Sequence, residues 1–507
     1  MTPGEKQRRQ IVIGTAVVKS SSCRRLRNRA WSGLSDAMIR LLAALVMFCL
    51  MPSDALAHAS DRGFVLLLPT GHYIAGGAFA VAVSFLALVL LKPDTLQLVA
   101  AKRLPLFRLR FDPRFATSAL SFAVLVLLVT AGLFGSRDPL SNPLPLTIWT
   151  LFWVGLTLAS GVFGNLFRLF DPWYAVVRLF GGRPEGGRWT NETVSTNSGS
   201  TYLPAIIQFA AFAWFELVYP APDDPFRLAL VVTAYWAINF VAMLIVGHDR
   251  WTRTGECFSV FFRVISQLSI VETNRDENGF RVSLCLPGAR LMAATPLPMW
   301  GVFFVLMALA SVSFDGLMRT FWWLGHIGVN PLEFPGRSAV MMENTAGLVL
   351  AISLLTSAFM FCVWLGERLS GDRVQLARAA GLLVWSIVPI SLAYHFAHYL
   401  VALLINGQYA LVALSDPLSR GWNLFGTADH HVTAGLVMGP DAAWVLWNLQ
   451  AGVIVLGHVL AVVIAHLLAA RLHPDPRRAM RSQIPLTVLM VAYTVLGLWL
   501  LSTATGA

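Results

Sequence analysis

Charged residues are scarce in this chain. Only 13% of its 507 residues are Asp, Glu, Lys or Arg, 56% are hydrophobic, and the mean hydropathy is +0.64. A soluble domain carries about 25% charged residues, so this composition excludes one. Apolar runs near the roughly 20 residues that a helix needs to cross a membrane recur along the sequence. We predict ten spans: 73–91, 118–134, 146–167, 203–219, 228–246, 297–314, 346–365, 380–404, 443–470 and 484–501. The predicted fold class is therefore all-α, a polytopic membrane helix bundle, because backbone polar groups in lipid must be satisfied within the helix.

Cysteine and the common catalytic motifs are also lacking. The five cysteines show no paired spacing, which argues against a disulfide framework and against a thiolate metal site. The sequence contains no nucleophile elbow, no phosphate-cradling glycine loop and no zincin helix. It shows no convincing repeat and no separable soluble domain. Any chemistry must come from residues dispersed over one transmembrane domain.

Basic residues outnumber acidic ones by 38 to 27, and they gather on alternate loops. The five basic loops lie near 102–114, 168–188, 250–263, 368–378 and 471–481. The positive-inside rule places them in the cytoplasm, so the net charge of +11 indicates topology and not nucleic-acid binding. Two cytoplasmic segments are long enough for extra structure. We expect an interfacial turn and a flexible loop in 171–201, and a helix over 256–272 that lies on the membrane surface within 249–290.

Residues 1–57 have the pattern of a basic N-region followed by a signal peptide or anchor. Met38-Ile39-Arg40 precedes an apolar stretch, and Ala55-Leu56-Ala57 fits a small-x-small cleavage site. Translation starts at Met1 or at Met38. Cleavage after Ala57 makes His58 the first residue of a single transmembrane domain, 58–507, whereas an uncleaved anchor is the alternative. In both cases the following residues lie outside.

Seven of the eleven histidines fall on the outer side of this topology: His58, His72, His326, His395, His398, His430 and His431. His395 and His398 are three residues apart in one predicted span, so they share a helix face and are candidate ligands of one metal ion. A pair of interhelical hydrogen bonds is the alternative. Histidine within a span is costly to bury and usually marks a function.

Further metal ligands are expected from His58, His72, His430 and His431. A mature N-terminal His58 offers its amine and its ring nitrogen, an arrangement similar to the histidine brace of copper proteins. His72 lies at the edge of the first span, where an interface role is the alternative, and the adjacent His430 and His431 are alternatively solvated loop residues. His326 fits an aromatic interface belt better.

Glu216 is the candidate catalytic carboxylate, because it lies inside a span close to its outer end. It is predicted to act as a general base for a metal-bound water, as a ligand, or as a partner of a histidine ring. A hydrogen bond to a neighbouring helix is the alternative. The cofactor prediction is a divalent metal ion, with zinc, copper, manganese and iron all compatible with imidazole ligands.

Several segments together resemble the bacterial integral-membrane family of fenitrothion hydrolases. They are Ala57 to Gly63, Gly164 to Trp173, Trp214 to Pro225 and Gly247 to Val260, and the likeness runs over most of the chain from residue 57. The resemblance implies a multi-pass protein of the bacterial inner membrane that hydrolyses organophosphorus triesters. It also implies a related second membrane subunit as a partner, beside the lipid bilayer and a small apolar substrate. The site predicted from the residues then lies on the periplasmic side.

Two other classes stay open at this stage. A metal-handling permease also places histidines near an outer opening, with polar residues such as His458 continuing a path through the membrane. A copper-dependent membrane oxidoreductase is favoured if His58 is N-terminal and binds copper. His248, His466 and His473 fall on the cytoplasmic side, and we predict no site role for them.

Overall fold

The computed structural model describes residues 70–90, 98, 101–181, 202–276, 279–330, 336–371, 374–433, 435, 437 and 439–503. Contacts divide the chain into two units, of which one comprises residues 59–88 and 92–507 and the other residues 1–58 and 89–91. The arrangement described below is that of the first unit. The predicted signal segment 1–57 and His58 lie outside the described residues.

Nine helical segments in the described part are long and apolar enough to cross a membrane, which confirms the predicted polytopic helix bundle. Seven of them are built on α3 (Thr70–Leu90), α5 (Arg114–Phe134), α11 (Pro225–Val246), α15 (Met299–Met318), α17 (Met341–Ser370, preceded by η4, Arg337–Val340), α20 (Pro440–Leu472) and α21 (Pro476–Ser502). The other two are composite. One joins α6 (Pro143–Pro145), the π-helix η1 (Leu146–Leu156) and α7 (Thr157–Phe163), and the other joins α18 (Leu376–Leu383), the 3₁₀ turn η5 (Val384–Ile387) and α19 (Val388–Ser415).

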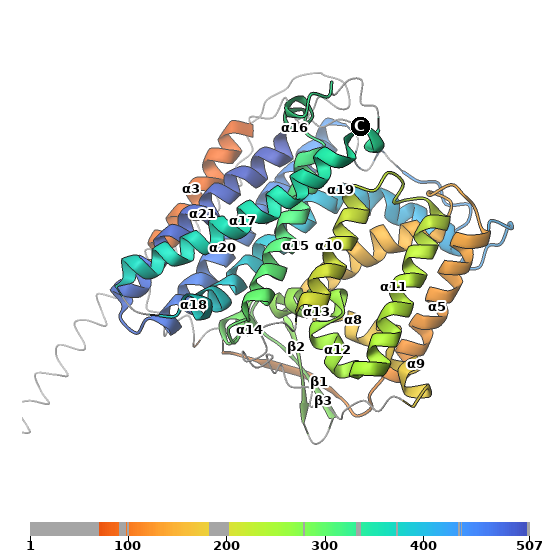
Figure 1. Cartoon of the computed structure of the whole chain (residues 1–507), viewed down its shortest axis with the longest axis horizontal. Coiled ribbons are helices and arrows are strands. Elements are labelled where there is room, and N and C mark those ends of the chain that lie inside the picture. The colour runs from red at the N-terminus through yellow and green to blue at the C-terminus, as the bar shows by residue number, and fades with distance from the viewer. Residues whose placement is uncertain are drawn as a thin grey trace, which may run out of the picture. The chain divides into compact units, whose positions relative to one another are not determined.

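The one predicted span that is not among these nine, 203–219, is the short helix α10 (Leu203–Leu217). Its 15 residues rise only about 22 Å. That is less than the ~30 Å of a hydrocarbon core. A second short helix, α13 (Cys257–Ile265, followed by η2, Ser266–Leu268), occupies the segment predicted to lie on the membrane surface. That prediction is wrong, because seven of the nine α13 residues are buried within the protein. Figure 1 shows α10 and α13 beside α15.

A small antiparallel sheet was not predicted. β1 (Leu104–Leu109) pairs with β3 (Gly279–Leu284), which pairs with β2 (Val271–Asp276), in the order β1-β3-β2. In Figure 1 the sheet lies at the end of the helices where α12 (His248–Thr254) and α14 (Ala289–Met292) are found. The remaining short helices are α8 (Phe167–Phe170), α9 (Tyr174–Leu179) and α16 (Phe321–His326).

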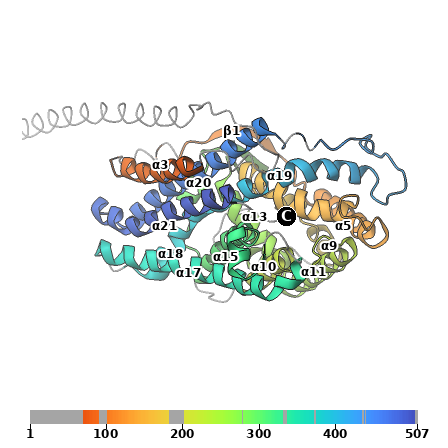
Figure 2. The same ribbon diagram turned by 90° about the horizontal axis from the view of Figure 1, so that it is seen from above.

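Small residues let the long helices approach one another. α17 packs on α21, and α21 on α20, and both views show the three side by side (Figures 1 and 2). A Cβ on Gly366 of α17 would lie 2.1 Å from the backbone oxygen of Ser482 on α21, and a Cβ on Gly457 of α20 would lie 2.5 Å from the Cβ of Ala393. Between helices in lipid, close van der Waals packing replaces the hydrophobic effect as the driving force.

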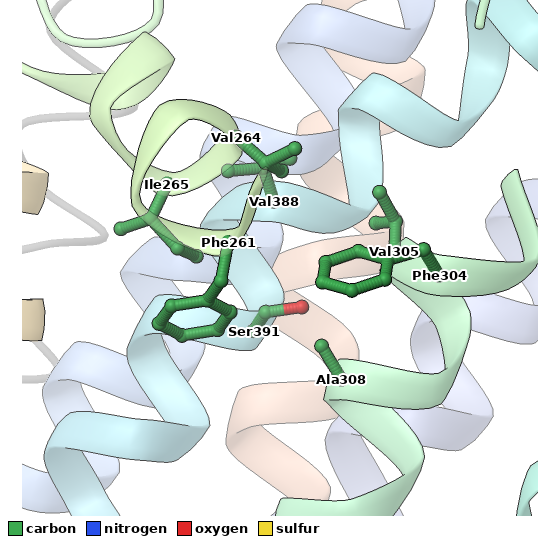
Figure 3. A pocket seen from close by; sticks show the side chains of 8 residues that line it. All are labelled: Phe261, Val264, Ile265, Phe304, Val305, Ala308, Val388 and Ser391. Atoms are coloured by element: carbon green, nitrogen blue, oxygen red, sulfur yellow. The ribbon is translucent and has the colours of Figure 1, made fainter. Parts of the chain in front are cut away.

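The packing between α13, α15 and α19 leaves a void of about 10 Å³. Figure 3 shows its lining, in which the Ser391 hydroxyl is the one polar group among rings and methyl groups such as Phe261, Phe304 and Val388. This space holds about one water-sized sphere and is too small for a substrate. It does not mark a binding site.

Candidate functional site

A cluster of ionisable side chains joins three helices at the ends of α10 and α15. We call it the Asp315 cluster, and its members are Glu216, Asp315, Arg319, His398 and Tyr399. Asp315 is only 2% exposed, and its Oδ2 atom accepts a hydrogen bond from His398 Nε2 at 2.7 Å. The same oxygen accepts a second hydrogen bond from the Tyr399 hydroxyl at 2.9 Å. A buried carboxylate in a membrane helix is thus paired, as the cost of an isolated charge there requires.

Tyr399 connects Asp315 to Glu216. Its hydroxyl oxygen lies 3.2 Å from Glu216 Oε1 and 2.9 Å from Asp315 Oδ2. A hydroxyl has one proton and donates to one carboxylate at a time, while its oxygen can accept from a protonated partner. The three groups therefore form one hydrogen-bonded system in which a proton can change position without movement of the backbone.

Two arginines add positive charge beside this system. Arg319 follows the last residue of α15, and its Nη2 atom lies 3.5 Å from Asp315 Oδ1. That distance is at the limit for a hydrogen bond, and Oδ1 is buried with no hydrogen-bond partner among the described residues. Arg337 donates to the backbone oxygen of Glu216 at 2.8 Å. Oδ2 of Asp315 therefore accepts from two donors, while Oδ1 interacts with the positive charge of Arg319.

Exposure differs sharply within the pair of Asp315 and His398. The carboxylate is 2% exposed and the imidazole is 28% exposed. A carboxylate accepts and does not donate, so His398 carries its proton on Nε2 and presents Nδ1 as an acceptor. A buried carboxylate that orients an accessible imidazole in this way is the arrangement of a general base in many hydrolases.

The sequence predicted Glu216 and His398 as site residues, and the structure brings both into the Asp315 cluster. His395, the other predicted member of the metal-binding pair, points to a different helix. Its Nε2 atom donates to the backbone oxygen of Trp153 at 2.9 Å, and its ring packs edge-on against the Trp153 indole. The two imidazoles thus make separate interhelical hydrogen bonds, which is the alternative left open by the sequence.

Trp153 belongs to the π-helix η1, which explains why its carbonyl is available to His395. A π-helix shifts backbone hydrogen bonding by one residue, and such segments are frequent at functional sites. The Trp153 oxygen also accepts from Thr157 Oγ1 at 2.6 Å. His395 therefore stabilises an irregular helix directly behind Tyr399, whose ring centroid is 4.8 Å from that of His395.

The other predicted ligands that the structure describes lie at exposed positions. His72 is exposed in the first turn of α3, and His430 and His431 are exposed in the loop after α19. His326 bonds the Trp322 carbonyl and stacks on its indole, as an interface residue does. Among the described residues, no group of three or more His, Cys, Asp and Glu side chains is placed to hold a metal ion.

Sequence reasoning missed Asp315, Arg319 and Tyr399. Asp315 is the one charged residue in α15, but the predicted span ended at Phe314 and left it in a loop. A carboxylate one residue past a predicted span end is a signal that could have found it, because span ends are uncertain by a few residues. Tyr399 follows His398 directly and lies four residues after His395, so it shares the His395 face of the helix.

The fold and this cluster define the class of the protein: a polytopic α-helical membrane protein with a buried carboxylate, tyrosine and histidine system near one end of its spans. No protein family model, no curated protein and no solved structure matches the chain.

Proposed function

We propose that this protein is a membrane-embedded hydrolase of uncharged organophosphorus triesters of the fenitrothion type. The observation that carries the proposal is the 2.7 Å contact between buried Asp315 and partly exposed His398. The resemblance of the sequence to fenitrothion hydrolases supports the reaction class, and the cluster supplies the residues for it.

The reaction needs a base for water and no covalent intermediate. His398 Nδ1 takes a proton from a water molecule while the water oxygen forms a bond to phosphorus and the bond from phosphorus to the aryl oxygen breaks. The nitrophenolate leaves with the bonding electron pair, and His398 returns its proton to it or to solvent. Asp315 is a positioning residue that holds the imidazole tautomer and stabilises the imidazolium. Tyr399 contacts both Asp315 and Glu216, and the prediction of Glu216 as the base itself stays a prediction.

The position of the cluster suits a substrate that arrives through lipid. The positive-inside rule predicts that the basic loops are cytoplasmic, and this supports a position of the Asp315 cluster toward the periplasmic side of a bacterial inner membrane. The triester is uncharged and partitions into the bilayer. The indole and phenyl side chains near Glu216, among them Trp214 and Phe215, offer an apolar surface at this depth.

No step of this proposal is routed through a metal ion. Oδ2 of Asp315 is already occupied by two hydrogen-bond donors, and His395 is bonded to a backbone carbonyl, so the described residues do not fit a metal centre. The prediction of zinc, copper, manganese or iron stays a prediction, because it depends on His58 as well.

The test is nitrophenol release from fenitrothion by membranes that contain the chain, alone and together with a related subunit. We expect His398→Gln and Asp315→Asn each to lower kcat about 10² to 10⁴-fold, the usual contribution of general-base catalysis. His326→Gln is the matched control, since that histidine is exposed and outside the cluster. A chelator arm shows whether a metal takes part. Absence of release by the wild type in both combinations, or equal rates for His398→Gln and His326→Gln, contradicts the proposal.

A permease is the second candidate, and one observation favours it. α10 and α13 are apolar helices too short to span a membrane, and transporters commonly build their midplane sites from short or interrupted helices. Uptake of a metal ion or organic solute by proteoliposomes, lost in Glu216→Gln and without turnover of fenitrothion, would support this alternative. The copper oxidoreductase hypothesis depends on His58, which lies outside the described residues.

A further inference from the structure

A second site of a different character lies at the other end of α15. There a cavity of about 440 Å³ opens between the small sheet, α8, α12, α13 and the end of α7; we call it the arginine cavity. Six arginines line it, and only three carboxylates do: Arg103, Arg114, Arg168, Arg253, Arg263 and Arg290 against Asp171, Asp249 and Glu272. Its size is within the range of small-molecule sites.

The carboxylates in this lining are already engaged. Glu272 forms a salt bridge with Arg103 across the sheet. Asp171 and Asp249 both bind His248, whose Nε2 atom lies 2.6 Å from Asp171 Oδ2 and whose Nδ1 atom lies 3.1 Å from Asp249 Oδ1. They form no salt bridge with two other arginines of the lining.

Arg263 and Arg290 are those arginines, and their contacts are weak. Arg263 reaches the Thr252 carbonyl and the Tyr202 hydroxyl at 3.4 Å, and Arg290 reaches neutral oxygens at 3.3 to 3.4 Å. No salt bridge joins either one to a carboxylate in the described part of the chain. Such long, neutral contacts leave the guanidinium donors poorly satisfied, which is the state of an anion site before its ligand binds.

A third arginine of the lining, Arg168, also lies in an environment with an excess of positive charge. Burial and the charge of neighbouring Arg114 lower the pKa of Arg168 to about 10, so the guanidinium is still charged at neutral pH in a positive environment. The backbone beside it is specialised. Gly164 adopts a φ of +99°, a conformation that glycine tolerates best, and it turns the chain from α7 toward α8 along the cavity wall.

The cavity lies at the depth of a membrane interface. Its lining includes Phe163 at the end of one candidate span, Arg114 at the start of another, and Leu297 two residues before α15. Apolar residues such as Phe167, Val282 and Trp385 alternate with the arginines. Asp315 lies 16 residues further along α15 than Met299, roughly 24 Å along the helix axis, so this cavity is distinct from the Asp315 cluster.

We propose that the arginine cavity binds a phosphate-bearing anion, with Arg263 and Arg290 as the residues that contact its phosphate oxygens. Planar guanidinium groups match phosphate oxygens in pairs, and the mixed apolar lining at the membrane interface suits the headgroup and glycerol of an anionic phospholipid. A soluble organic phosphate presents the same chemistry. This inference is independent of the proposed hydrolase activity.

The experiment measures binding of a fluorescent short-chain phosphatidylglycerol to the full chain in neutral detergent, by anisotropy. We expect Arg263→Gln with Arg290→Gln to weaken binding at least tenfold, because the double variant removes both charged groups that donate to the phosphate oxygens. Arg253→Gln tests the same lining at an exposed side chain whose loss cannot unfold the protein, and we expect a loss of about threefold. Arg481→Gln, an exposed arginine of α21 outside the cavity, is the control and keeps wild-type affinity.

Competitors distinguish the source of the phosphate. Displacement by unlabelled phosphatidylglycerol but not by inorganic phosphate supports a lipid headgroup, and equal displacement by inorganic phosphate or glycerol 3-phosphate supports a soluble ligand. Displacement by diacylglycerol, which lacks phosphate, overturns the proposal. It is also overturned if the double variant and Arg253→Gln both bind the probe as well as Arg481→Gln does.

Discussion

His248 provides the sharpest quantitative prediction, because both of its ring nitrogens face a carboxylate. The imidazole and Asp171 are 8% and 7% exposed, and the doubly protonated ring donates to Asp171 and to Asp249. Burial opposes the charged ring, but the two carboxylates outweigh it and raise the pKa of His248 from 6.5 to about 9. The stabilisation is therefore complete below pH 6.5 and is lost as the pH rises through about 9.

The size of this stabilisation follows from the change in the pKa of His248. A pKa that rises from 6.5 to about 9 corresponds to about 3 kcal/mol of stability. At roughly 2.1 cal/mol/K of unfolding entropy per residue, a chain of this length loses about 3 °C of Tm over this pH range from His248 alone. Asp171→Asn removes the charge that contributes most, so we expect it to abolish about half of this loss or more, and to lower Tm at pH 6.

The assay is thermal unfolding of the purified protein in detergent at several values between pH 6 and pH 10. Asp224→Asn is the matched control: Asp224 caps α11 and makes no described contact with a histidine, and Asn is an equally good cap. We expect this control to keep the wild-type dependence on pH. The reasoning is refuted if Asp171→Asn and the wild type lose the same Tm between pH 6.5 and pH 9.

Three further predictions follow from the packing. Gly366→Ala places a Cβ 2.1 Å from the Ser482 backbone oxygen, so we expect a loss of about 1 to 3 kcal/mol, measured by denaturant unfolding. Glu256→Ala removes a buried side chain that accepts two backbone N–H groups at the start of α13, and it should cost about 1 to 2 kcal/mol by the same measurement. His395→Leu removes one of two side-chain donors to the Trp153 carbonyl, and the Thr157 hydroxyl remains; we expect about 0.5 to 1.5 kcal/mol of lost stability, and a kcat reduced far less than in a His398 variant.

Each of these has its own control. Gly76→Ala lies in α3 with nothing within 4 Å of the added Cβ, so it should be neutral, and a similar loss in both glycine variants would contradict the close-approach argument. Glu256→Gln keeps an acceptor and should retain most of the cap. If His395→Leu lowers kcat as much as His398→Gln while the protein stays folded, the two histidines act together and the metal hypothesis regains its support.

The spans could be predicted because the thickness of the bilayer sets the length of the apolar run that crosses it. Nine of the ten predicted runs are helices long enough to cross a membrane. The other, predicted over 203–219, is the 15-residue helix α10, which ends at Leu217. The sheet escaped prediction because its strands β1 and β3 are far apart in the chain, with Leu104 opposite Leu284. A hairpin signal was nevertheless present, since Asn278-Gly279 precedes residues 280–284, in which apolar and polar residues alternate.

The surface-helix prediction failed because an amphipathic pattern does not say what the apolar face meets. Phe258, Phe261 and Phe262 share one side of α13, while Ser259 and Arg263 lie on another side, as in an interfacial helix. Such an apolar face can also pack against protein, and in α13 it does. The aromatic contacts of Phe258 with Phe152 and Phe212 show where that surface is buried.

The partners of the histidines could not be derived from local pattern. Three imidazoles are paired with carboxylates on other helices or loops: His398 with Asp315, His248 with Asp171 and His473 with Glu367. The paired residues are 83, 77 and 106 positions apart, so helical periodicity places each side chain on a face but says nothing of what that face meets. The sequence therefore identified costly polar groups and left their pairing open.

Among these three pairs, accessibility separates structure from chemistry. His473 is fully buried and His248 is 8% exposed with both ring nitrogens bonded, so each of them holds its elements together and has no free nitrogen facing solvent. His398 is 28% exposed, one of its nitrogens is bonded to Asp315, and that carboxylate is tied through Tyr399 to a second one. A group that exchanges protons with a substrate needs both an oriented ring and a free nitrogen. Of the three pairs, the one in the Asp315 cluster meets both conditions, which is why the proposed chemistry rests on it.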